Sequence, residues 1–443
     1  MQRTKGIGLV ALLAFLIFAM PRANIRVGPV PVYAIDMVAA LILVHASYMG
    51  NAARRVRYPF RMIVVVMVFL CVISELAAIL YGGRPIDAIY LTTRFFLAHA
   101  ILLAVPLMVR SPADIELVLK AVAVALLINA GLMILTSLPM TRRIAMTTVF
   151  SIPMLDPASD QVLSSYLYEV DGDAGARGRT LVGVSIIGAT YASIAWPLVA
   201  YLRSGDFHLS PLWRGISYAA VLLAPMGVVL SYSRGALAGA VLVVLAVLVL
   251  PGGRLRRNII QPILYSVAVV AVVGVGSTIF FFDRYVNRFA AVIENPVADV
   301  RETDRLYSYI EPFAHVLENP QFLLFGEGLA LDRLGIGEQE VAANHSLLGA
   351  GYYAHGMIWT FLFLFLILAA VRFLNRQRKV WRGHPGQHWP QALLLAYMPI
   401  FTLAAFAPGL ANHPRTVMMY FLMLSLIVSL RAAPFAQAAK PYP

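Results

Sequence analysis

The sequence predicts an all-α polytopic membrane protein, and two observations support this fold class. Hydrophobic residues make up 60% of the 443-residue chain, charged residues only 13%, and the mean hydropathy is +0.77. The apolar residues also fall in long runs, and hydrocarbon about 30 Å thick requires roughly 20 apolar residues per helix. Because a span in lipid must satisfy its own backbone hydrogen bonds, a bundle of helices is expected.

This length rule predicts about twelve spans, in one transmembrane domain that covers residues 1–443. The first run follows two basic residues and resembles a signal peptide, but no small-x-small cleavage site precedes Pro21, so it is expected to remain as an anchor. Polar residues 231–235 divide the apolar stretch 214–251 into two spans. The expected spans lie near residues 6–21, 28–49, 60–82, 89–109, 115–139, 180–202, 214–231, 234–251, 258–281, 350–372, 390–411 and 414–431.

Two polar segments, 140–179 and 282–349, are expected to be loops. The first is rich in proline and glycine and is expected to be irregular. The second contains eleven acidic residues, five arginines and two histidines. Apolar residues at helical spacing predict a short amphipathic helix at 303–318, ended by Asn319-Pro320, and the glycine-containing residues 323–329 are expected to form a turn.

The basic residues predict the orientation of the spans. With both termini in the cytoplasm, 20 of the 35 Lys and Arg residues fall on the cytoplasmic side and 14 on the outer side. All the lysines are then cytoplasmic: Lys5, Lys120, Lys379 and Lys440. The positive-inside rule therefore predicts that both long loops are external. The net charge of +13 reflects this topology, so nucleic-acid binding is not expected.

Metal and thiol chemistry are not expected. Cys71 is the only cysteine and lies within a predicted span, which excludes an intrachain disulfide and a cysteine metal site. The sequence Asp171-Gly172-Asp173 resembles a metal-binding pair of enzymes that use nucleotide sugars. It lies in a loop predicted to be external, where nucleotide sugars are absent, so no metal is assigned to it.

Asp36, Glu75 and Arg94 are charged residues in the interior of predicted spans. Such residues are functional candidates by default, because a charge in hydrocarbon is costly. A pairing of Arg94 with Glu75 or with Asp36 inside the bundle is an equally good structural explanation. His355, deeper in a span, is interpreted as a polar packing residue, and His315 as a surface residue.

The side predicted to be external carries further candidate functional residues, and each of them also has an ordinary structural explanation. Arg234 at a span boundary either reaches the interface or binds an anion. Arg305 and Arg301 either bind an anion or belong to a solvated helix face, and acidic neighbours offer Arg301 a local ion pair. His345, with an ordinary pKa of about 6.5, is a candidate general base, although a lone histidine at a helix end is often structural.

Four short motifs occur in a fixed order over roughly residues 175–375. They are Ser-x-Ser-Arg-Gly-Ala at 231–236, an arginine in the external loop before a helix, Phe-Gly-x-Gly-Leu at 325–329, and Asn-His-Ser-Leu-Leu at 344–348 followed by Gly356. In these motifs and their shared external location, the chain resembles the O-antigen ligase and polysaccharide polymerase family of bacterial inner membranes. The resemblance implies a GT-C-like bundle with a large periplasmic loop and a metal-independent, inverting glycosyltransferase without cofactors.

The implied donor is a glycan on undecaprenyl diphosphate at the periplasmic face. Without a metal, arginines would hold the departing diphosphate, and a neutral histidine would take the proton of the acceptor hydroxyl. For Arg179 the match is loose, since the glycine expected after it comes one residue late, at Gly183. The residues implied are Arg234, Arg305, Arg301 and Arg179 for diphosphate binding, His345 for catalysis, and Ser231, Ser233 and Asn344 in support.

The acceptor distinguishes members of this family. A polymerase joins lipid-linked repeats into an O-antigen, capsule or exopolysaccharide, and a ligase moves the finished polymer onto lipid A–core. The polymerase is preferred because genomes usually carry several polymerases and one ligase; a flippase and a chain-length regulator are the expected pathway partners. A transporter of polysaccharide or lipid-linked glycan is the alternative from another class, but its charges would be expected at the bilayer midplane rather than in one external loop.

Overall fold

Helices dominate the structure. The computed structural model describes residues 4–27, 30–49, 60–137, 139–149, 180–182, 185–204, 207–231, 233–250, 253–266, 268, 313–332, 347–382, 386–406 and 414–432. Of these residues 84% are helical, and the sheet found among them is one two-stranded hairpin. Five described helices are long and apolar enough to cross a membrane. The all-α membrane class is therefore confirmed.

The described helices run in chain order from α1 to α18. The helices are α1 (Ile7–Ala19), α2 (Ala34–Ser47), α4 (Arg61–Leu80), α5 (Pro85–Met108), α6 (Pro112–Ser137), α7 (Pro139–Thr148), α9 (Ser185–Leu202), α10 (Pro211–Leu230), α11 (Arg234–Val249), α15 (Leu329–Asp332), α16 (Leu347–Val380), α17 (His388–Phe406) and α18 (Pro414–Ala432). A 3-10 helix, η2 (Pro320–Phe322), and strands β1 (Asn24–Val27) and β2 (Val30–Tyr33) complete the described elements, with further helical stretches at 253–266 and 313–318.

A described helix overlaps each of the expected spans, but three local predictions need correction or remain open. Residues 30–33 of the second span form strand β2, because prolines at positions 29 and 31 disfavour the start of a helix there. The first loop begins with helix α7 rather than irregular chain. Of the amphipathic helix predicted at 303–318, residues 313–318 are helical and 303–312 lie outside the described residues.

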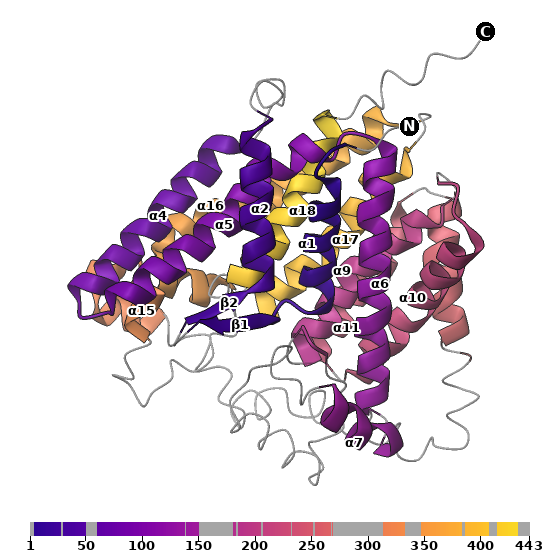
Figure 1. Cartoon of the computed structure of the whole chain (residues 1–443), viewed down its shortest axis with the longest axis horizontal. Helices are drawn as coiled ribbons and strands as arrows, with labels where there is room; N and C mark the ends of the chain where they lie inside the picture. The colour runs from indigo at the N-terminus through magenta and orange to yellow at the C-terminus, as the bar shows by residue number, and fades with distance from the viewer. Residues whose placement is uncertain are drawn as a thin grey trace.

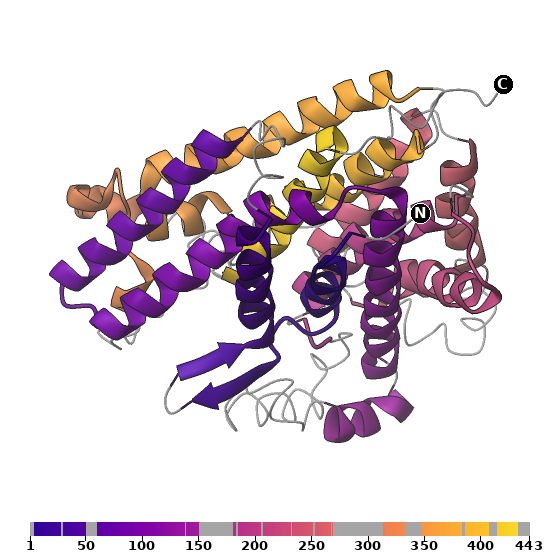
Figure 2. The same cartoon turned by 45° about the horizontal axis from the view of Figure 1, so that its top comes forward.

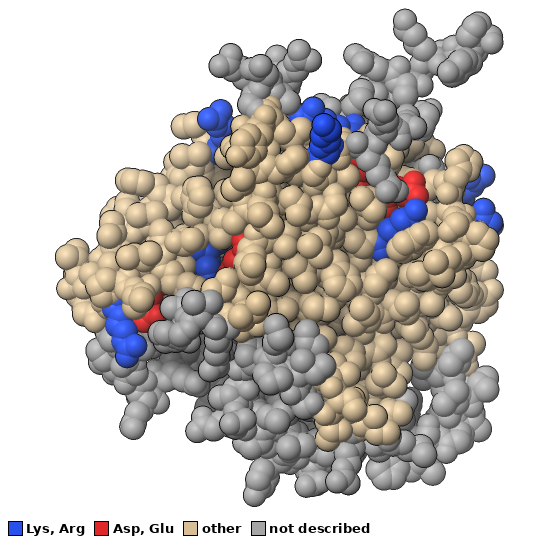
Figure 3. All heavy atoms as spheres, viewed as in Figure 1, with Lys and Arg blue, Asp and Glu red and all other residues tan. Residues whose placement is uncertain are grey.

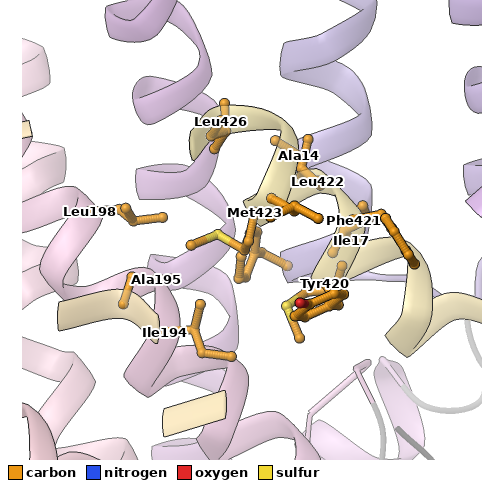
Figure 4. Packing of buried hydrophobic residues seen from close by; sticks show 14 of the residues in the cluster. Ala14, Ile17, Ile194, Ala195, Leu198, Tyr420, Phe421, Leu422, Met423 and Leu426 are labelled. Atoms are coloured by element: carbon orange, nitrogen blue, oxygen red, sulfur yellow. The ribbon is translucent and has the colours of Figure 1, made fainter. Parts of the chain in front are cut away.

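The core is built around α18. This helix packs along α5, while α1 and α10 pack along α6 and α17 packs along α9 and α11 (Figure 1). Figure 4 shows Tyr420 and Met423 of α18 between Ile17 of α1 and Ile194 of α9, and all four side chains are buried. A helix that is apolar and covered on every side belongs to the interior of a bundle. Exposed side chains of α4 such as Phe69 instead mark a lipid-facing flank.

Contacts between helix termini that are distant in sequence show which termini lie at the same end of the bundle. At one end, here the terminal end, the backbone N–H and hydroxyl of Thr4 donate to Asp114 at the start of α6, and Asn258 donates to the carbonyl of Ala200. At the opposite end, the loop end, α1 leads through the β1–β2 hairpin into α2, and α10 leads into α11 (Figures 1 and 2). Lys and Arg are sparse on the flank between the two ends in Figure 3.

Candidate functional site

The two serines of the Ser-x-Ser-Arg motif shape the turn between α10 and α11. Ser231 is the C-cap of α10 and fully buried, and its hydroxyl donates to the carbonyl of Val228 at 2.6 Å. The same oxygen accepts from the backbone N–H of Ser233 at 3.2 Å. Ser233 is the N-cap of α11, where its hydroxyl accepts from the N–H of Ala236 at 3.3 Å. Both serines therefore fix the backbone of this turn.

These caps place Arg234 as the first residue of α11 at the loop end. The first turn of a helix has N–H groups without intrahelical partners and carries a partial positive charge. Together with an arginine, such a helix start favours an anion such as phosphate. Arg234 thus occupies a position suited to the role implied for it. Five other implied residues lie outside the described residues: Arg179, Arg301, Arg305, Asn344 and His345.

The structure resolves the pairing of Arg94, for which the sequence left two partners open. Its Nε donates to Asp36 Oδ2 at 2.6 Å, in a pair whose side chains are 7% and 10% exposed. Asp36 lies in the first turn of α2, where the helix dipole also favours a carboxylate. Glu75 instead accepts hydrogen bonds from the backbone of α15. The Arg94–Asp36 pair lies at the loop end, because Asp36 follows the β1–β2 hairpin.

Two more arginines lie beside this pair. Arg415, at the start of α18, is within electrostatic range of Arg22 and Arg94. The ring of Tyr33 lies under both cations, 4.1 Å from the guanidinium carbon of Arg94 and 5.4 Å from that of Arg415. Cation–π contacts of this kind stabilise a guanidinium while leaving its in-plane N–H groups available. We refer to Arg22, Arg94 and Arg415 as the arginine cluster.

The β1–β2 hairpin brings this cluster together. Residue Asn24 of β1 pairs with Tyr33 of β2, and Ala34 donates its N–H to the carbonyl of Ala23 at 2.8 Å. The side chain of Asn24 also donates to the carbonyl of Arg22. Because the strands are antiparallel, Arg22 before the hairpin and Tyr33 at its end become neighbours. The hairpin thus closes α1 onto α2 at the loop end.

Glu75 holds a loop segment through backbone hydrogen bonds. Its carboxylate, 1% exposed, accepts the backbone N–H of Leu329 at 3.0 Å and that of Ala330 at 3.1 Å. These N–H groups open the short helix α15, so the charge meets unsatisfied donors. Glu75 is therefore a capping residue for the chain that follows the Phe-Gly-x-Gly-Leu motif.

The glycines of that motif permit backbone-to-backbone packing. Gly326 and Gly328 have φ of +75° and +78°, and a Cβ on Gly328 would lie 2.4 Å from the carbonyl oxygen of Ser74. Gly356 in α16 has φ +79°, and its Cβ would lie 2.2 Å from the carbonyl oxygen of Leu324. The segment 323–330 is thereby wedged between α4 and α16, as the predicted turn with close approach requires.

The described histidines near this segment have structural surroundings. His355 is fully buried, 3.3 Å from the hydroxyl of Ser74 and packed against the rings of Phe95 and Trp359, as expected of a packing residue. His315 is not a plain surface residue: its Nε2 lies 2.7 Å from Glu327 Oε2, and its side chain is 32% exposed.

Two site residues were missed at the sequence level, Arg22 and Arg415. A signal was present, since each directly follows a proline at the external edge of a predicted span, in Pro21-Arg22 and Pro414-Arg415. The sequence does not indicate that the two residues are close in space, because 392 residues separate them. Their proximity depends on the packing of α1, α2, α5 and α18 at one end of the bundle.

The described residues contain no group of three or more His, Cys, Asp or Glu side chains that could hold a metal ion. A scan against models of known protein families and a search of curated proteins both find no match to this chain.

Proposed function

We propose that the chain is a glycosyltransferase that uses a glycan on a lipid diphosphate, undecaprenyl diphosphate by the motif resemblance, at the outer face of the bacterial inner membrane. The observation that carries the proposal is the position of Arg234, the first residue of a capped helix at the loop end. There, an arginine and a helix N-terminus act on the same anion. The order of motifs 231–236, 325–329 and 344–348 supports the same reading.

The proposed topology is twelve crossings with both termini in the cytoplasm. A described helix overlaps each expected span, and the described turns at 20–33 and 231–234 share one end of the bundle, which supports this topology. The described lysines, Lys5, Lys120 and Lys379, lie toward the terminal end, whereas the basic residues described at the loop end are arginines, so the positive-inside rule favours a periplasmic loop end. Substrate would then reach Arg234 from the outer leaflet.

The proposed reaction breaks the bond between the first sugar and the lipid diphosphate. Arg234 and Arg305, with Arg301 or Arg179 as further candidates, would stabilise the negative charge that develops on the leaving diphosphate. Donors aimed at developing charge commonly contribute about 10²–10³-fold in rate. His345 would accept the proton of the attacking acceptor hydroxyl, a role worth about 10²–10⁴-fold. Attack from the face opposite the diphosphate inverts the anomeric centre.

The acceptor proposed first is another lipid-linked repeat unit, which makes the chain a polysaccharide polymerase. Transfer of the finished polymer to lipid A–core, the ligase reaction, is its direct competitor. Deletion in the native host separates the two. Products limited to a single repeat indicate a polymerase, and long lipid-linked chains that never reach lipid A–core indicate a ligase.

The test is transfer by the purified full-length chain in nanodiscs, with a lipid-linked glycan, a chelator, and neither nucleotide nor ion gradient. Transfer is expected, and Arg234→Ala and His345→Ala should lower it by about 100-fold or more. Matched controls are Arg254→Ala and His208→Ala, exposed residues of the terminal end, which should retain activity. Near-full activity of His345→Ala at equal protein level would show that the base assignment is wrong.

A further inference from the structure

One exposed face of α16 changes from apolar to basic along the helix. Six exposed residues follow one another on it at steps of three or four, and we call them the α16 stripe: Phe361, Phe365, Leu368, Arg372, Arg376 and Lys379. Residues three and four apart are neighbours on a helix surface, so the stripe is one continuous line of side chains. Its three apolar members are between 55% and 63% exposed.

The basic half of the stripe lies at the terminal end. Trp389, in the first turn of α17, packs against Tyr201 in the last turn of α9 with ring centroids 5.3 Å apart, and the adjacent Ala200 belongs to that end. The chain reaches α17 directly from the end of α16. Residues 357–380, which follow the kink at Gly356, rise about 36 Å, whereas hydrocarbon is about 30 Å thick. The apolar half therefore lies at the depth of acyl chains, and the basic half reaches the headgroups.

Helix α4 adds a further cation beside this basic half. The ring of Phe60 contacts that of Phe373, with centroids 6.5 Å apart, so the start of α4 lies at the depth of Arg372. The exposed Arg61 begins α4, and the exposed Phe69 follows two turns later. The two helices pack side by side (Figures 1 and 2). Each of them thus carries a basic end on an apolar, lipid-facing surface.

Carboxylates are sparse around these cations. The chain contains no acidic residue after Glu340, and the acidic residue of α4 is Glu75 at the loop end. Of the described acids at the terminal end, Glu116 pairs with Lys120 and Asp114 is fully buried. The ion pairs found among the described residues join other side chains than the four cations of α4 and α16. The surface therefore favours an anionic ligand.

We infer that this surface binds an anionic phospholipid, whose phosphate lies among Arg61, Arg372, Arg376 and Lys379 and whose acyl chains lie along the apolar half of the α16 stripe. Long basic side chains keep their charge at the headgroup level while their stems cover apolar surface. A soluble acidic partner would match only the basic half, whereas a lipid matches both halves. The inference is independent of the proposed function, because it involves neither glycan transfer nor the loop end.

The test is the lipid selectivity of the α16 stripe in the full-length chain, reconstituted in nanodiscs. Asn375→Cys, at an exposed position beside Arg376, carries a fluorophore, and the native Cys71 is buried and gives a low background. Phosphatidylglycerol or phosphatidylcholine, each with the same spin label on an acyl chain, quenches the fluorophore when it binds beside it. Phosphatidylglycerol should quench at a mole fraction about tenfold lower or less, since each Lys or Arg near an anionic headgroup contributes about fivefold.

Variants in the same labelled chain locate the selectivity. Joint replacement by Arg372→Gln, Arg376→Gln and Lys379→Gln should abolish the preference, whereas Arg372→Lys with Arg376→Lys keeps the charge and should retain it. The matched control removes three exposed arginines elsewhere at the terminal end and should leave the preference unchanged: Arg254→Gln, Arg256→Gln and Arg257→Gln. Melting temperatures establish that each variant is folded.

Three results would overturn the inference. The first is equal quenching by the two lipids in the labelled chain, and the second is a preference that survives in the folded triple glutamine variant. The third is quenching that ignores the headgroup while the number of chains per nanodisc rises, which indicates a second copy on this face. If the triple variant does not fold, salt decides: the preference should fade at about 1 M salt, where charges are screened beyond about 3 Å, and a preference that persists there contradicts the site.

Discussion

The carboxylate of Glu75 in α4 binds the backbone N–H of Leu329, 254 residues further along the chain, at 3.0 Å. A charge that would be costly in a membrane span is thereby used to fix the end of a loop segment. Ala330 adds a second hydrogen bond to the other carboxylate oxygen. The segment that carries the Phe-Gly-x-Gly-Leu motif is therefore part of the helical wall.

Replacement of Glu75 should loosen this wall. Glu75→Gln places an amide where two N–H groups need acceptors, so one buried donor loses its partner at a cost of about 1–3 kcal/mol. The thermal unfolding midpoint in detergent should fall. The control is Glu116→Gln, since Glu116 forms a partly exposed i,i+4 pair with Lys120 worth about 0.3–0.5 kcal/mol. Equal midpoints for the two variants would contradict the capping role.

Gly356→Ala should disturb the same region more severely. The residue has φ +79° and ψ 177°, a conformation nearly restricted to glycine, which costs any other residue about 1–3 kcal/mol before the clash with Leu324 is added. Low expression or a marked fall in the unfolding midpoint is expected. Gly131→Ala in α6 meets open space and should be neutral or stabilising by up to about 1 kcal/mol.

The Arg94–Asp36 pair should show non-additive energetics. Asp36→Asn leaves a buried guanidinium without its counter-charge and should destabilise the chain by about 3–5 kcal/mol. Arg94→Gln in the Asp36→Asn background should restore part of that loss. A double-mutant cycle of unfolding free energies measures the coupling. Additive effects of the two substitutions would mean that the pair contributes little beyond its separate residues.

Substitutions at Ser233 distinguish the effect of the helix cap on stability from the effect of charge beside Arg234 on activity. Ser233→Ala should cost about 1 kcal/mol of stability through the lost cap. Ser233→Asp keeps a capping oxygen but adds a negative charge beside Arg234, so stability should hold while glycan transfer falls. Ser233→Asn is the neutral control and should retain both. Full transfer by the aspartate variant would argue against an anionic substrate at this helix start.

Cysteine labelling should reveal the orientation of the bundle. The native Cys71 is buried, so an introduced cysteine can be read against a low background. Gln321→Cys at the exposed loop end should react with a membrane-impermeant maleimide in intact spheroplasts. Arg256→Cys at the terminal end should react only after permeabilisation. The reverse pattern would place the loop end in the cytoplasm and exclude the proposed periplasmic reaction.

The sequence predicted the helices well because hydropathy and span length act locally. It named Asp36 and Glu75 as possible partners of Arg94 but could not choose, since the choice depends on which faces of α2, α4 and α5 meet. It missed the hairpin, because Val30-Pro31-Val32 continues the apolar run into α2. The prolines at positions 29 and 31 are a local signal for the hairpin, whereas the partner of Arg94 depends on long-range packing, which no local pattern encodes.

The candidate site likewise contains residues that a local motif predicts and residues that only long-range packing brings together. Ser231 and Ser233 were named as supporting residues, and their capping bonds follow from a motif only three residues long. The arginine cluster draws its members from the turn after α1, from α5 and from the start of α18, which are distant in sequence, so only tertiary structure could assemble it. The placement of Arg305 and His345 remains a prediction from the motif order.

The wedge formed by residues 323–330 also sets a boundary for protein engineering. Its hydrogen bonds run to both neighbours, from Glu327 and Gly328 to α16 and from Leu329 to Glu75 of α4. A foreign loop grafted next to this segment must therefore be joined outside residues 323–330. Grafts that retain the native wedge should fold with their new sequence, whereas chimeras cut inside it would separate the glycines from the helices they were shaped to fit.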